Sequence, residues 1–80
     1  NYPNPFNPST KIIFSLDKTE NVKLAVYNLL GQQIAVLAEG ARIAGQHIVE
    51  FNGANLPSGI YFYTLQAGDQ VFTNKMMLLK

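Results

Sequence analysis

Hydrophobic residues recur at every second position along most of the chain, which is the period of half-buried β-strands. In residues 11–16, for example, Ile12, Phe14 and Leu16 fall on one face. The same alternation predicts strands at 22–27, 46–51, 60–67 and 70–79, and a shorter strand at 33–37. Residues 38–45, which contain two glycines, are expected to form a loop, and 68–69 a hairpin turn. No segment has a sustained helical period, so the chain is predicted to be all-β.

The first ten residues form a separate, proline-rich segment. Pro3, Pro5 and Pro8 fix φ and favour extended geometry in the residues before them, which predicts an extended arm or an edge strand over 1–10. With this arm the chain has about seven short strands at the spacing typical of sandwiches. We therefore expect one domain, residues 1–80, built as an antiparallel β-sandwich. Its predicted core consists of the in-phase residues Phe14, Leu24, Val26, Val49, Phe51, Tyr61 and Leu65.

Composition narrows the possible partners. The chain has 80 residues, of which 48% are hydrophobic and 14% charged, whereas about a quarter charged is usual for a soluble domain. The low charge suggests that part of the surface meets something other than water. The net charge is +1 and the basic residues are scattered, which argues against binding to nucleic acid or anionic lipid.

The chain has no cysteine, which excludes disulfides and thiolate-bound metals. No run approaches the roughly 18 apolar residues of a transmembrane helix, so no transmembrane segment is expected. No signal peptide is visible at Asn1, which suggests a processed chain or the tail of a longer protein.

Residues able to carry out catalysis are present but show no recognisable arrangement. His47 is the single histidine and lacks partners at metal-ligand spacing. Ser58 lies in a Pro-Ser-Gly turn, and the six glycines each fall in a separate turn, not in a phosphate-binding loop. The five carboxylates do not point to a catalytic pair. We therefore predict no catalytic residue, no metal and no cofactor.

Phe62 leaves two interpretations open. It lies between Tyr61 and Tyr63, so a strand must place it on the face opposite the two tyrosines. An exposed aromatic ring there would suit a carbohydrate-binding module. The favoured interpretation is packing, either against the second sheet or beneath the N-terminal arm.

Several motifs in order across the whole chain resemble a known family. These are YPNPFNPST at residues 2–10, VYNLLGQQI at 26–34, GQH at 45–47, FNG at 51–53, LPSGIY at 56–61 and KMMLLK at 75–80. Together they resemble the type A C-terminal sorting domain of the type IX secretion system, and they are also similar to the immunoglobulin-like domain of the flagellar hook-cap protein. The resemblance implies an immunoglobulin-like Greek-key sandwich of about seven strands at the end of a secreted bacterial protein.

The resemblance also implies partners and a role. The expected partners are an outer-membrane translocon and a sortase-like peptidase, and the expected destination, reached through the periplasm and the outer membrane, is the exterior or the cell surface. The candidate sorting-motif residues are Pro3, Asn4, Pro5, Gly31, Gly59, Tyr61, Lys75 and Lys80.

The residues themselves suggest how recognition would work. Gly31 and Gly59 permit tight turns, Tyr61 combines a large apolar body with a hydroxyl that needs a partner, and Lys75 should project from the last strand. If that strand is at a sheet edge, its open backbone groups offer pairing to a receptor strand. One alternative is a subunit of an extracellular filament that binds copies of itself by strand donation; a carbohydrate-binding module is less favoured.

Overall fold

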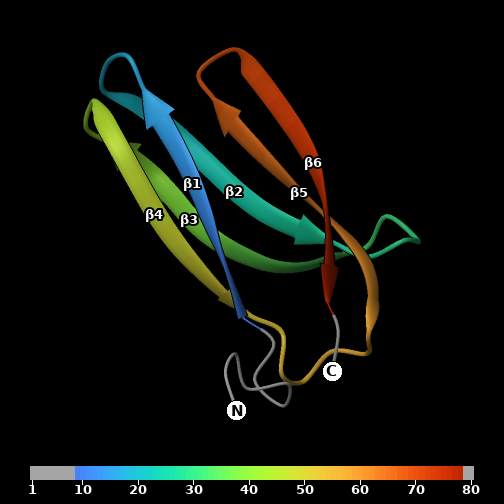
Figure 1. Cartoon of the computed structure of the whole chain (residues 1–80). Coiled ribbons are helices and arrows are strands. Elements are labelled where there is room, and N and C mark those ends of the chain that lie inside the picture. The colour runs from blue at the N-terminus through green and yellow to red at the C-terminus, as the bar shows by residue number, and fades with distance from the viewer. Residues whose placement is uncertain (1–8, 79–80) are drawn as a thin grey trace.

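The computed structural model describes residues 9–78, and these residues form six β-strands. The strands are β1 (Ser9–Leu16), β2 (Glu20–Tyr27), β3 (Gln33–Arg42), β4 (Gly45–Asn52), β5 (Gly59–Ala67) and β6 (Gln70–Leu78). β1 and β4 form one sheet, and the other four form a second in the order β3-β2-β5-β6 (Figure 1). All pairings between these strands are antiparallel, so the all-β prediction is confirmed.

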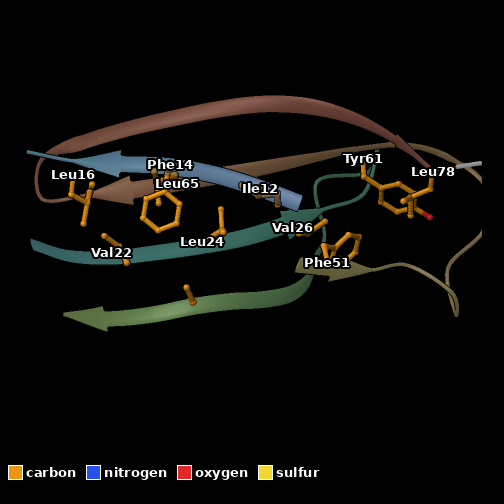
Figure 2. Close-up of a cluster of buried hydrophobic side chains, with 12 residues drawn as sticks. Ile12, Phe14, Leu16, Val22, Leu24, Val26, Phe51, Tyr61, Leu65 and Leu78 are labelled. Carbon is orange, nitrogen blue, oxygen red and sulfur yellow. The ribbon is translucent and has the colours of Figure 1, made fainter. Parts of the chain in front are cut away.

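One hydrophobic core lies between the two sheets (Figure 2). Its centre is β2, where Leu24 and Val26 are 0% exposed. The predicted core residues Phe14, Leu24, Val26, Phe51, Tyr61 and Leu65 are all buried. The buried cluster also includes Ile12, Leu16, Val22, Ala38, Ala67 and Leu78, which were not in the predicted core.

Val49 was predicted to be in the core and is only half-buried, packed against the cluster. It lies in β4, which pairs with β1 alone among the described strands, so one flank of the strand is uncovered.

The alternation predicted the positions of most strands but not the length of β3. Residues 38–42 were expected to be loop, yet β3 continues to Arg42, which pairs with Glu20. The register between β2 and β3 shifts between Leu24 and Ala25, so that Leu37 is an extra residue on β3. Such a bulge reverses the alternation of faces beyond it. The reversal hid the continuation, in which Ala38 is buried opposite Leu24.

Only the end of the segment predicted as an extended arm or an edge strand falls within the described residues. Ser9 and Thr10 belong to β1, which is at an edge of its sheet, and they pair with Asn52 and Phe51. Residues 1–8, with Pro3, Asn4 and Pro5, lie outside the described residues. The immunoglobulin-like Greek-key arrangement of about seven strands is therefore not confirmed, since residues 9–78 supply six strands in two antiparallel sheets.

Replacing a leucine at the centre of the core tests this packing. Leu24→Ala should lower the free energy of unfolding by about 2–5 kcal/mol, because the cavity left at a fully buried position adds to the lost hydrophobic transfer. The matched control is Leu30→Ala, since Leu30 is 83% exposed and its loss should change stability by no more than about 0.5 kcal/mol. Urea unfolding followed by circular dichroism measures both. Equal effects of the two substitutions would contradict the assignment of the core.

Candidate functional site

The last strand, β6, lies at an edge of the larger sheet, as the recognition hypothesis requires. It pairs with β5 along its whole length and with no other strand among residues 9–78. Every residue of β6 from Gln70 to Lys75 is exposed. An edge of this kind has unpaired backbone N–H and C=O groups that another strand can bind.

The face of β6 that points away from the core carries Lys75. This residue is exposed and pairs in register with Phe62 of β5, which in turn pairs with Tyr27 of β2. The prediction that Lys75 projects from the last strand is therefore confirmed.

The same register corrects the interpretation of Phe62. The core-facing residues on either side of it, Tyr61 and Tyr63, contact the cluster between the sheets. Phe62 must therefore point to the outer face, where it is half-buried between its cross-strand neighbours. The expectation that it packs against the second sheet was wrong, because the second sheet covers the opposite face. The alternative beneath the N-terminal arm lies outside the described residues.

The end of β6 is held in place by a close contact that sequence reasoning missed. Leu78 is buried, and it packs directly over Gly53 in the connection between β4 and β5. A Cβ atom at Gly53 would lie only 2.5 Å from Leu78 Cδ1, so any larger residue would displace the leucine or the loop. The sequence motif Phe51-Asn52-Gly53 does not indicate this contact, because Leu78 is 25 residues away from Gly53 in the chain.

Tyr61 fixes the start of β5. Its side chain is buried, and its hydroxyl donates a hydrogen bond of 2.7 Å to the carbonyl oxygen of Pro57. This bond spans the entry to β5, where Gly59 has a φ of 153°, a value that favours glycine. The hydroxyl partner expected for Tyr61 is thus confirmed as a backbone carbonyl.

Gly31 lies in the turn between β2 and β3, with φ of 81°. The turn is organised by Asn28, whose Oδ1 accepts hydrogen bonds from the backbone N–H groups of Leu30 and Gln32 at 2.9 and 3.0 Å. An asparagine in this role is a recognised turn signal, and it could have been identified from the sequence. The turn holds Leu29 and Leu30 in solvent, 66% and 83% exposed.

The structure brings some of the candidate residues together and leaves one apart. Gly59 and Tyr61 line a mostly apolar hollow of about 300 Å³, whose other wall is formed by Asn28, Leu29 and Leu30 of the Gly31 turn. Lys75 does not line this hollow. Pro3, Asn4, Pro5 and Lys80 lie outside the described residues, so the structure does not place them.

Residues 9–78 show no arrangement typical of a metal site or a catalytic histidine. Within 9–78 there is no cluster of three or more His, Asp or Glu side chains able to hold a metal ion. His47 stacks on Phe14 with ring centroids 5.2 Å apart, and its Nε2 lies 2.8 Å from the carbonyl oxygen of Ile43, so it has a packing role at the core margin. No helix in the described part of the chain is long and apolar enough to cross a membrane.

Two facing antiparallel sheets with an exposed edge strand define a small all-β module whose open edge has backbone groups that another strand can pair with. Residues 1–79 match the family of secretion system C-terminal sorting domains, and the chain belongs to this family of type IX sorting signals. No match was found among curated proteins or among solved structures.

Family membership selects among the functions that the sequence left open. It makes the chain a sorting signal for type IX secretion, in preference to a filament subunit or a carbohydrate-binding module. It also implies recognition by the type IX system and export to the cell surface or the exterior. The family is non-catalytic.

The hydrogen bond of Tyr61 can be tested by removing one oxygen atom. Tyr61→Phe should lower the free energy of unfolding by about 1–2 kcal/mol, because the Pro57 carbonyl loses its partner while the ring stays buried. Tyr27→Phe is the matched control, since the Tyr27 hydroxyl makes only a 3.5 Å exposed contact with Gln33 Oε1. Denaturant unfolding compares the two variants, and similar stabilities would show that the Tyr61–Pro57 bond contributes little.

Proposed function

We propose that the chain directs an exported bacterial protein to the outer-membrane translocon of the type IX system, and that β6 and the start of β5 carry the signal. The observation that carries the proposal is the position of β6: within the described residues it is an edge strand with one open backbone edge and an exposed stretch from Gln70 to Lys75. A receptor could read this strand without unfolding the core.

The contacts of β6 support a division between recognition and anchoring. At one end, Leu78 is buried over Gly53, and β5 pairs with every residue from Gln70 to Leu78. These contacts fix the position and direction of the strand. Lys75 lies three residues before the anchored Leu78 and is exposed on the outer face of the sheet. It is the only charged residue of β6. A single cation at a fixed position suits a signal that is read by side chain as well as by backbone.

The proposal extends to the later steps and to the finer topology. A sortase-like peptidase at the outer membrane is the second partner, and the exported protein, having crossed the periplasm, is attached at the cell surface; family membership supports both. The immunoglobulin-like Greek-key sandwich of about seven strands is the proposed topology. Its support is the antiparallel pairing of all described strands and the single core between two sheets.

Export of a reporter tests the role of Lys75. The chain is fused to the C-terminus of a reporter in a host with a type IX system, and the exported fraction is measured together with thermal stability. Lys75→Ala should reduce export several-fold and leave stability within about 0.5 kcal/mol, because the side chain is exposed. The control is Lys11→Ala, which removes the same charge from an exposed position on the other sheet.

The stability measurement separates a lost signal from a lost fold. Met76→Ala serves as a folding reference, and because Met76 is only half-buried its cost should lie below the ~2–5 kcal/mol of a fully buried methionine. If Lys75→Ala is exported as well as the parent chain, the signal does not include this charge. The proline-rich segment with Pro3 and Pro5 then becomes the next candidate.

We also predict that the chain has no hydrolytic activity. In the described residues the single histidine is engaged with a backbone carbonyl and an aromatic ring, not with a serine or a carboxylate. Purified protein should therefore release no product from chromogenic peptides, esters or glycosides. An activity that co-purifies with the chain and falls in His47→Ala would contradict this prediction.

A further inference from the structure

Within residues 9–78 the two sheets differ in width, so the smaller sheet does not cover all of the larger one. The larger sheet has four strands and the smaller has two among the described residues. In Figure 1, β1 and β4 lie in front of β2 and β3, and β6 lies beyond the edge of this front layer. At one side of the molecule the sheets are joined, since β3 and β4 are connected by Ile43 and Ala44 alone. At the other side the outer strands are β1 and β6, which do not pair.

A groove runs between β1 and β6. One wall is formed by β1 from Ile12 to Leu16, the floor includes Leu65 of β5, and the other wall is formed by Phe72 and Asn74 of β6. It consists of two adjoining hollows of about 230 and 190 Å³, which share Ser15, Leu65 and Phe72 as lining residues. We call this feature the β1–β6 groove.

Phe72 shows that the groove is an uncovered part of the core-facing surface. It pairs in register with Leu65, so both side chains point to the same face of the sheet. Leu65 is 7% exposed, whereas Phe72 is 52% exposed. A large aromatic side chain on the core side of a sandwich is ordinarily covered by the opposite sheet. Among residues 9–78 the opposite sheet ends at β1 and does not cover Phe72.

The open edge of β1 determines what shape of ligand would fit. Within the described residues β1 pairs only with β4, so the backbone groups on its other side have no strand partner. The groove follows five residues of β1, a length of about 16 Å for an extended chain. An added strand would bind these backbone groups, and every second side chain would lie on Phe72 and Leu65.

The charged residues at one end of the groove indicate which kind of strand it would bind. Asp17 and Glu20 line that end, and Asp69 lies in the adjoining turn between β5 and β6. Lys18 is the one cation in the turns that join β1 to β2 and β5 to β6. Arg42 of β3 pairs with Glu20 in register, but its guanidinium donates to the carbonyl oxygens of Glu39 and Ala41. With Arg42 included, these five charges still sum to −1. The remaining lining residues are uncharged and largely apolar. Charge complementarity therefore favours a strand with an apolar body and a Lys or Arg at this end.

We propose that the β1–β6 groove accepts an extended strand from a protein of the secretion machinery, which adds beside β1 as a third strand of the smaller sheet. Its alternate apolar side chains cover Phe72, and a basic residue at one end faces Asp17 and Glu20. The identity of the partner rests on the proposed function. The strand-accepting groove rests on the geometry of β1, β5 and β6.

A synthetic peptide tests the groove directly. The probe is a hexapeptide of alternating valine and threonine that begins with lysine, which suits antiparallel addition to β1. Amide chemical shifts of the full 80-residue chain are followed by NMR during titration. Saturable shifts should appear at residues 12–16 and 72. They should weaken at least several-fold when lysine is replaced by glutamate, or when alternate peptide amides are N-methylated and lose their donors.

A variant pair connects peptide binding with export. Phe72→Ala should leave the fold intact, because the side chain is half exposed, and should reduce both peptide affinity and reporter export several-fold. Ile48→Ala is the matched control, since Ile48 is 60% exposed on the outer face of β4 and does not line the groove. It should bind the peptide and be exported as the parent chain is.

The outcomes distinguish the groove from the proposed function. Peptide-induced shifts confined to β3 or to the outer face, or normal export of Phe72→Ala, would overturn the assignment.

Signals of residues 2–7 that move together with those of β1 would show that the chain's own first residues fill the groove. Shifts at 12–16 that grow with protein concentration alone would assign it to a second copy; both results overturn the partner assignment. Peptide binding without any export of the reporter would support the groove and contradict the proposed function.

Discussion

The fold depends on burying the inner face of β2. This strand has partners on both sides, β3 and β5, and its residues Leu24 and Val26 are completely removed from solvent. A chain of 80 residues buries only about 60% of the surface that it exposes when unfolded, so it can form one core and no more. Within residues 9–78 the two strands of the smaller sheet cover that core and little more. The small size of the chain therefore accounts for the open strand edges and for the exposure of Phe72.

The sequence predicted the strands wherever one face is buried and the register is regular. In such strands hydrophobic and polar residues alternate with a period of two. β1, β2 and β5 show this plainly, and some of their inward residues, Phe14, Leu24, Val26, Tyr61 and Leu65, were predicted to be in the core. β3 was shortened because the bulge at Leu37 reverses the faces, so that Leu37 and Ala38 both contact the core region in succession. A prediction that assumes strict alternation cannot place the residues that follow an inserted one on the correct face of the sheet. The depth of Val49 was misjudged for a different reason: alternation gives the face of a residue but not the number of strands that flank it.

The same distinction explains the site. The exposure of Lys75 and the hydroxyl partner of Tyr61 follow from local pattern and side-chain chemistry, and both were predicted. The contact of Leu78 with Gly53 joins distant parts of the chain, so the sequence around either residue does not predict it. Phe72 is the clearest case. The alternation along residues 70–79 puts Phe72 on the same face as Met76 and Leu78, and in the structure this is the inner face. Phe72 is nevertheless half exposed, because among the described residues the smaller sheet ends before it reaches Phe72. The width of a sheet is a property of the assembled fold and is not contained in any one strand.

Exposed strand edges are ordinarily a hazard, and proteins protect them with charge, proline, bulges or covering loops. Residues 9–78 protect their edges unevenly. β3 carries two bulges and the charged residues Glu39 and Arg42, whereas β6 has Lys75 alone, and β1 has Lys11 alone. Among the described strands, β1, β4 and β6 each have an open edge and one charged residue, which is Lys11, Glu50 or Lys75, and two of these strands, β1 and β6, border the groove. A domain that is bound through strand pairing cannot block the edge that its receptor uses, and it still has to avoid pairing with its own copies. One cation on each of β1 and β6 satisfies both requirements, since like charges oppose self-association and still leave the backbone accessible. The distribution of charge between β3 and the β1–β6 side is the one that the proposed strand recognition requires, and it agrees with the proposal that this side binds the partner.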